Sequence, residues 1–252
     1  MAQIANQKNR SARWVRQQLD AADLKPRELT PVPTVIAVDV TFWGRHYGVC
    51  VFRSPTLKRN LWWKEVELET PDIYETGLTN LRQQGWLIQA VVIDGKRGVD
   101  KVFNGLPVQI CQFHQMKTVT RYLTRKPQTR AGQELRSIAL GLTRNTEAKF
   151  TNQLQGWSDH WKDFLNERTP CSCCKPNRWP YTHRKLRAAR RSLLTNLPYL
   201  FTYQKYPELN IPNTTNCLDG MFSQVKNRLA VHRGLRRDRR FKIITEILMG
   251  KD

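Results

Sequence analysis

The chain has 252 residues, 40% of them hydrophobic, and its 42 lysines and arginines against 21 aspartates and glutamates give a formal net charge of +21. The hydrophobic fraction, with eight tryptophans, nine phenylalanines and seven tyrosines, excludes a disordered basic tail. Such a charge excess repels itself and is favourable beside a polyanion, so nucleic acid is the expected partner. An anionic membrane surface is less favoured, because no long basic amphipathic helix with a clean apolar face is present.

No run of apolar residues is long enough to cross a bilayer and no signal peptide opens the chain, so we expect a cytoplasmic protein. Thiols stay reduced in that compartment, which favours free cysteines or metal ligands over disulfides. The six cysteines are Cys50, Cys111, Cys171, Cys173, Cys174 and Cys217.

Residues 9–24 predict a short basic helix that Ser11 can cap and whose apolar side consists of Val15 and Leu19. It can be the second helix of a helix-turn-helix with its arginines facing phosphates, in which case we expect the partner helix upstream of Met1. The alternative is a packing helix with a solvated basic face.

Residues 35–44, VIAVDVTFWG, predict a buried strand because apolar and β-branched residues dominate the run. Asp39 lies in its middle, where a carboxylate is costly to bury unless a cation holds it. A second apolar run, residues 89–94, ends on Asp94. Asp39 can be a structural acid that starts a turn, but two strands that each deliver a carboxylate indicate a metal site at one end of a sheet.

The order of the predicted elements indicates the fold. Strands are expected at 35–43, 47–54, 61–70, 89–94 and 108–113, with helices at 70–85 and about 99–104. Three meander strands followed by helix, strand, helix and strand describe the ribonuclease-H-like arrangement, an α/β fold with a mixed five-stranded sheet flanked by helices. The first and fourth strands are central neighbours in that fold, so Asp39 and Asp94 are expected at the same edge.

From residue 116 to about 197 the chain is predicted to be helical and strongly basic. Trp157, Trp161 and Leu165 recur at helical spacing, which favours core packing over a base-stacking platform. Residues 184–191, RKLRAARR, place five cations among eight residues, and we interpret them as a phosphate-binding face rather than a solvated one.

Residues 213–235 predict the last helix of the core. Its buried stripe is expected to consist of Leu218, Phe222, Val225 and Leu229. Asp219 lies about 100° of helical rotation from Leu218, at the margin of that stripe. A helix laid against the sheet would aim Asp219 at the strand edge, so Asp219 is the expected third acid.

Three carboxylates beside a positively charged surface suit Mg²⁺ or Mn²⁺, which prefer oxygen ligands. Two such ions about 4 Å apart clamp the attacking and leaving oxygens of an in-line phosphoryl displacement. We therefore expect two ions held by Asp39, Asp94 and Asp219, with DNA bound by cations nearby.

Four runs, AVDVTFWG, VVIDGKRG, QICQFHQMK and TTNCLDGMFSQVKNRLAVHRGL, resemble those of mutator-like DDE/D transposases of bacterial insertion sequences, over about residues 30–245. By this resemblance Asp39, Asp94 and Asp219 match the three catalytic acids, and Cys111 and His114 match a Cys-x2-His signature. Many relatives carry glutamate at the third position. We interpret the aspartate here as a variant of an active triad, with Glu208 and Glu246 as fallback ligands.

The resemblance implies cleavage of double-stranded DNA at insertion-sequence ends and strand transfer to target DNA. It also implies at least a homodimer in the working complex and a bacterial, nucleoid-associated location. DNA contacts are expected from His114, Lys185, Arg187, Arg190, Arg191, Asn216, Lys226, His232, Arg233 and Arg236. The rival functions are a structure-selective nuclease or resolvase and a catalytically inactive, domesticated DNA-binding protein.

Four segments follow from these assignments. Residues 1–30 form a basic helical segment, 31–125 the first part of the catalytic core, 126–197 a helical basic insertion before the last catalytic helix, and 198–252 the rest of the core with a basic tail. A structural zinc site joining Cys111 and His114 to the CSCC cluster or His183 is a further alternative. For His114 we favour phosphate contact or packing over zinc.

Overall fold

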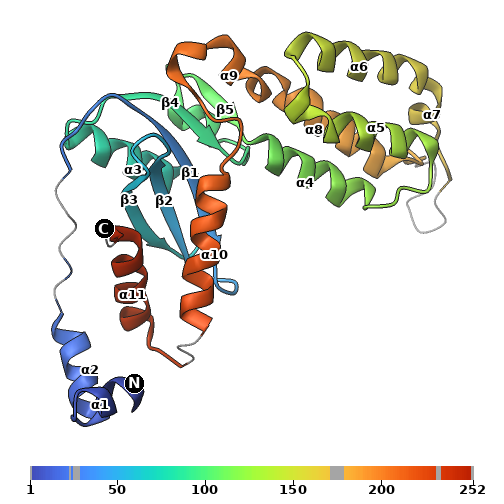
Figure 1. Cartoon of the computed structure of the whole chain (residues 1–252). Helices are drawn as coiled ribbons and strands as arrows, with labels where there is room; N and C mark the ends of the chain where they lie inside the picture. The colour runs from blue at the N-terminus through green and yellow to red at the C-terminus, as the bar shows by residue number, and fades with distance from the viewer. Residues whose placement is uncertain (1, 23, 25–28, 171–178, 231–233, 251–252) are drawn as a thin grey trace.

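Five strands form one mixed sheet, and helices cover both of its faces (Figure 1). The computed structural model describes residues 2–22, 24, 29–170, 179–230 and 234–250. The strands are β1 (Thr34–Phe42), β2 (Gly48–Ser54), β3 (Arg59–Val66), β4 (Ile88–Ile93) and β5 (Val108–Ile110). They lie in the order β3-β2-β1-β4-β5, with β1, β2 and β3 antiparallel and β4 parallel to both β1 and β5. The first and fourth strands are therefore central neighbours, as predicted.

Two strands end at least three residues earlier than the sequence predicted. The strand expected at 108–113 ends at Ile110, because helix α4 (Gln112–Leu123) begins directly after it. The strand expected at 61–70 ends at Val66, and α3 (Pro71–Gln83) follows with proline in its first turn.

Side chains of β1 alternate between two cores. Ile36 and Val38 pack in the core under α3, while Val35 and Ala37 pack under α10 (Asn216–Ala230) and α11 (Arg237–Met249). The apolar stripe predicted for the last core helix is confirmed, because all four of its members are buried: Leu218, Phe222, Val225 and Leu229.

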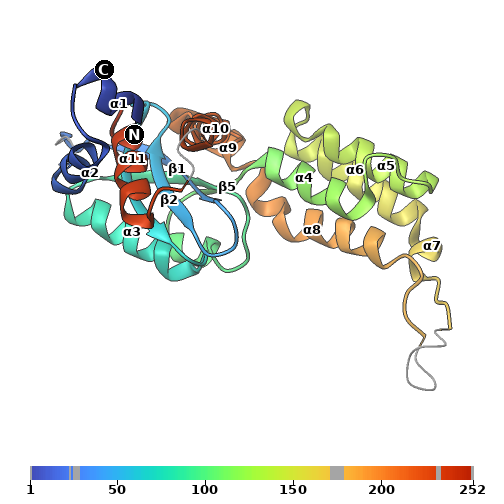
Figure 2. The ribbon, with the colours of Figure 1, turned by 90° about the horizontal axis from the view of Figure 1, so that it is seen from below.

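Between β5 and α10 the chain forms a helical bundle that projects from the sheet (Figures 1 and 2). Its helices are α4, α5 (Arg130–Leu140), α6 (Glu147–His160), α7 (Lys162–Asn166), α8 (Arg184–Leu200) and α9 (Thr202–Lys205). Single 3-10 turns occur at η1 (Asp100–Phe103), η2 (Leu142–Arg144) and η3 (Pro207–Leu209). Trp157 and Leu165 are buried in the bundle, as predicted. Among the described helices, none combines the length and the apolar character needed to span a bilayer.

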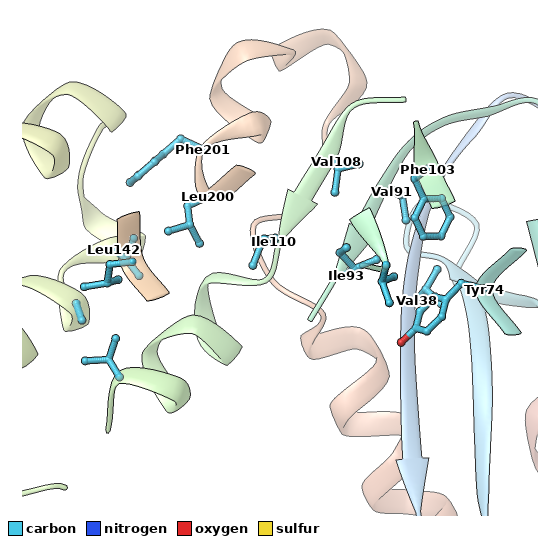
Figure 3. Close-up of a cluster of buried hydrophobic side chains, with 14 of the residues drawn as sticks. Val38, Tyr74, Val91, Ile93, Phe103, Val108, Ile110, Leu142, Leu200 and Phe201 are labelled. Carbon is cyan, nitrogen blue, oxygen red and sulfur yellow. The ribbon is translucent and has the colours of Figure 1, made fainter. Parts of the chain in front are cut away.

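The core under α3 continues without a break from the sheet into the bundle (Figure 3). Ile93 and Ile110 of the sheet belong to the same buried cluster as Leu200 and Phe201 at the end of α8. The buried side-chain amide of Gln109 donates a hydrogen bond to the carbonyl of Leu200 at 2.9 Å. Apolar packing and this hydrogen bond together fix the bundle against the β5 edge.

In the described residues before the sheet, the chain forms α1 (Ala2–Gln7) and α2 (Ala12–Ala21). Ser11 caps α2 as predicted, with its hydroxyl accepting from the backbone N–H of Trp14 at 3.1 Å. The sequence placed a partner helix for α2 upstream of Met1, whereas the structure has α1 directly before it, joined through a turn in which Asn9 has a φ of 49°. The two short helices contact each other across this turn.

The C-terminal end of α2 is held by α11. Both carboxylate oxygens of Asp20 accept hydrogen bonds from Arg239 at 2.7 Å. The ammonium of Lys242 donates to the backbone carbonyls of Leu19, Asp20 and Ala22. Two cations of the basic tail, Arg239 and Lys242, thus bind the end of α2.

Candidate metal centre

Asp39 on β1 and Asp94, directly after the neighbouring parallel strand β4, lie level with each other. Ala37 of β1 pairs with Val92 of β4, and each aspartate is two residues further on. Because side chains alternate along a strand, the two acids share the sheet face of Ala37 and Val92, which is the face under α10. The juxtaposition expected from element order is therefore present.

Asp219 reaches this place from the first turn of α10. Leu218 is buried against the sheet, and the next residue along the helix turns toward the end of β1. One ligand atom each from Asp39, Asp219 and His114 lie within 4.8 Å of one another. These three side chains, named here the metal centre, could hold a metal ion.

His114 is positioned by the junction between β5 and α4. The backbone N–H of Cys111 donates to the carbonyl of Ile93 at 2.7 Å, which ties the start of α4 to the end of β4. The Cys111 sulfur accepts from the backbone N–H and the hydroxyl of Thr215, at 3.3 and 3.4 Å. The same hydroxyl lies 3.4 Å from Nδ1 of His114. In the Cys-x2-His motif, cysteine therefore fixes the backbone and histidine faces the acids.

The electrostatics of the centre follow from burial and mutual charge. Burial raises the pKa of Asp39 to about 7, the charges of Asp94 and Asp219 add to the rise, and His114 opposes it. A hydrogen bond with Cys111 is the largest cause that raises the pKa of His114 to about 9, and the charges of the acids add to it. The positive charge of protonated His114 thus partly compensates the negative charges of Asp39 and Asp219.

One oxygen of the centre has no protein partner. Oδ2 of Asp219 is buried and receives no hydrogen bond from the described part of the chain. Oδ1 of Asp39, in contrast, accepts from the backbone N–H of Val40 at 2.8 Å. A buried carboxylate oxygen without a donor is costly unless a cation binds it. The donor set of two carboxylates and one imidazole suits a divalent metal ion, with imidazole favouring transition metals.

Asp94, predicted as the second metal ligand, is not in the three-residue group. Its Oδ1 accepts from the backbone N–H of Lys96 at 2.9 Å, in a turn where Gly95 has a φ of 84°. Asp94 and His114 line one cavity of about 490 Å³ beside the centre. His114, which the sequence assigned to DNA contact or packing, thus stands in the group with Asp39 and Asp219, and Asp94 lies beside that group.

The predicted DNA contacts on α8 divide into two kinds. Lys185 and Arg191 are exposed. Arg187 donates to the carbonyl of Leu165 at 2.8 Å and stacks on a tyrosine ring, and Arg190 donates to the hydroxyl of Ser158 at 2.8 Å. The second pair holds α8 against α6 and α7 inside the bundle.

The remaining predicted contacts lie on or near the C-terminal helices. Asn216 and Lys226 are exposed on α10, and Arg236 is exposed and pairs with Asp238 at 3.3 Å. His232 and Arg233 lie outside the described residues, as do Cys171, Cys173 and Cys174 of the zinc alternative. His183, the other proposed zinc ligand, pairs with Glu167 at 2.8 Å. Glu208 and Glu246 are exposed and are not in the metal centre.

Comparison with protein-family models, with curated proteins and with solved structures finds no match to this chain.

Proposed function

We propose that this chain is the catalytic core of a DDE/D transposase, which cuts double-stranded DNA at insertion-sequence ends and joins the freed 3′ ends to target DNA. The observation that carries the proposal is the convergence of Asp39 and Asp219, far apart in the chain, to within 4.8 Å beside the end of β4. A net charge of +21 supports a polyanionic substrate.

The topology supports the same proposal. A sheet in the order β3-β2-β1-β4-β5, with an antiparallel meander followed by two parallel strands, has the strand arrangement of the ribonuclease-H-like fold. The helical bundle between β5 and α10 has the place of an insertion before the helix of the third acid. Two transposon ends acting together imply a homodimer or a larger assembly on DNA.

Asp39, Asp219 and His114 would hold a divalent ion, either Mg²⁺ or, since an imidazole ligand favours transition metals, Mn²⁺, and Asp94 beside them would bind a second ion. When bound, such ions lower the pKa of an attacking water and stabilise charge on the leaving oxygen. His114 would release its proton as it becomes a ligand, because metal binding requires the neutral imidazole. Asp94 and Lys96 line the cavity next to the centre, where the phosphodiester would lie.

The experiment uses labelled duplexes that carry the DNA flanking the coding sequence, incubated with the full chain and Mg²⁺ or Mn²⁺. We expect cut products and products joined to a second duplex. Asp39→Asn, Asp94→Asn and Asp219→Asn should each abolish both. Asp163→Asn is the matched control, because Asp163 is an exposed acid on α7, within the bundle.

Two other outcomes would each favour one of the rival functions. Cutting that depends on the same acids without any joined product would indicate a nuclease or resolvase. DNA binding without metal-dependent cutting by the wild-type chain would indicate a DNA-binding protein whose centre no longer catalyses.

A further inference from the structure

The cavity beside the metal centre is bounded on one side by a stripe of α4. His114, Lys117, Thr118 and Arg121 all line it. Residues three, four and seven apart share one face of a helix, so these side chains form a row that runs away from the centre. At 1.5 Å of rise per residue, Lys117 and Arg121 are separated by about 6 Å along the helix axis.

The orientation of this row is fixed by the opposite side of α4. Val119 is fully buried, and the side chain of Gln115 exchanges hydrogen bonds with Ser192 at 3.1 Å and Asn196 at 2.7 Å on α8. Because α4 cannot rotate without breaking these contacts, they hold the row facing the cavity.

Two acids line the cavity; Asp94 lies beside the metal centre, and Glu69 is neutralised internally. Glu69 accepts a hydrogen bond from the Tyr74 hydroxyl at 2.6 Å and pairs with the Lys96 ammonium at 3.2 Å. The cations of the row are different. Lys117 lies over the Phe113 ring at 4.2 Å and Arg121 lies 5.7 Å from the Tyr122 ring, and neither forms an ion pair within the described part of the chain. Both are exposed, so the cavity presents two cations without acidic partners.

We propose that this face of α4, named here the α4 groove, binds the backbone of the DNA strand that is cut. Lys117 and Arg121 contact successive phosphates that lead away from the scissile phosphodiester at the metal centre. The aromatic rings beneath them hold the cations in place, which reduces the conformational entropy lost on binding. The assignment rests on the proposed function, because it takes DNA as the substrate.

The test measures DNA affinity of the full chain against salt concentration, by fluorescence anisotropy with a labelled duplex and without divalent metal, so that no cutting occurs. Each phosphate contact contributes about 0.9 to the slope of log affinity against log salt. Lys117→Gln and Arg121→Gln should each reduce the slope by about 0.9, and the double variant by about twice that amount.

Two controls match these variants. Arg82→Gln removes an exposed arginine from the last turn of α3, as Arg121→Gln does from the last turn of α4. Lys149→Gln removes an exposed lysine from α6. Both controls should keep the wild-type slope. Equal slopes in groove variants and controls, or a wild-type chain that binds no duplex, would overturn the assignment.

A second measurement locates the contact. Replacing one phosphate near the cut site by an uncharged methylphosphonate should weaken wild-type binding but leave Lys117→Gln or Arg121→Gln unaffected at one position each. If the loss of affinity caused by the methylphosphonate and the loss caused by the substitution add at every phosphate position, the assignment of the α4 groove is wrong. These results can be told apart from those that test the proposed function. If the variants reduce the salt slope but the chain does not cut DNA, the α4 groove stands and the proposed function fails. If the chain cuts DNA but the variants leave the salt slope unchanged, the proposed function stands and the α4 groove fails.

Discussion

Asp39 on β1 and His114 on α4 lie within 4.8 Å of each other and shift each other's pKa toward the charged pair, although burial dominates at Asp39. The carboxyl titrates at about 7 and the imidazole at about 9. Both values are raised in the folded protein, so the folded state binds these protons more tightly than the unfolded chain does.

The first prediction concerns pH. Stability of the metal-free protein should fall as pH rises from about 4 to about 7, because folded Asp39 ionises at higher pH than the ordinary 3.8. His114 contributes stability that is present below pH 6.5 and lost toward pH 9. The loss expected from Asp39, once pH exceeds its folded pKa of about 7, is of the order of 4 kcal/mol in the free energy of unfolding. Thermal unfolding at several pH values in a chelator measures it.

Asp39→Asn should reduce the change in stability between about pH 4 and about pH 7, because the carboxyl that titrates in that range is removed. Divalent metal should raise the midpoint of unfolding more at pH 8 than at pH 5, because protons compete with the ion for the same ligands. A metal effect that is equal at both pH values would contradict the assignment of these two side chains as ligands.

The second prediction concerns Asp219. Asp219→Asn removes one of the two carboxylates of the centre, so the stabilisation by Mn²⁺ should be lost; for an intact site it is about 2.7 kcal/mol at a metal concentration 100 times the dissociation constant. Without metal, the variant should be as stable as the wild type or more so, because a charge that raises the pKa of Asp39 is removed. Calorimetric unfolding with and without Mn²⁺ measures both, and Asp163→Asn should behave as the wild type.

The third prediction concerns the Cys111 thiol. Cys111→Ala removes the hydrogen bond that contributes most to the raised pKa of His114, so that pKa should fall from about 9 toward its ordinary 6.5. Titration of the histidine ring signals by NMR measures the shift, with His183 as a reference in the same spectrum. Thr215→Val should cost about 1 kcal/mol, because one hydroxyl loses its contacts to Cys111 and His114. An unmoved His114 signal in Cys111→Ala would show that the thiol does not tune this imidazole.

The fourth prediction concerns the attachment of the N-terminal helices. Lys242→Met removes the ammonium from the C-terminal carbonyls of α2, where a cation is favourable. Amide hydrogens of α2 should then exchange faster, while those of β1 and β4 keep their wild-type rates. Hydrogen exchange measured by mass spectrometry reports both. Lys226→Met, which removes an exposed lysine from α10, is the control.

The sequence predicted the sheet and its central pair of strands because β-branched runs and turn residues leave a local pattern. Asp219 was also predictable, since it lies beside the buried Leu218 on a helix with a clear apolar stripe. The place of His114 beside the acids was not predictable, because it depends on the β5–α4 junction and on Thr215, a residue distant in sequence. Its signal was the Cys-x2-His spacing directly after a strand.

The cations were harder to interpret from sequence. A run such as RKLRAARR does not reveal that Arg187 and Arg190 bind neighbouring helices, because their acceptors, Leu165 and Ser158, lie elsewhere in the chain. Lys117 and Arg121 were missed for the opposite reason. They are isolated cations on α4, and only the structure shows that both side chains line the same cavity.

The hydrogen bonds between α11 and the end of α2 fix the position of the N-terminal helices relative to the sheet. Asp20 and the last carbonyls of α2 are bonded to Arg239 and Lys242, and α11 in turn packs on the sheet face that carries Asp39. If α2 binds a DNA duplex, the distance along that duplex from the bound segment to the acids of the metal centre would therefore be constant. The number of base pairs between the gripped segment and the cut would then follow from the fold rather than from the reach of a tether.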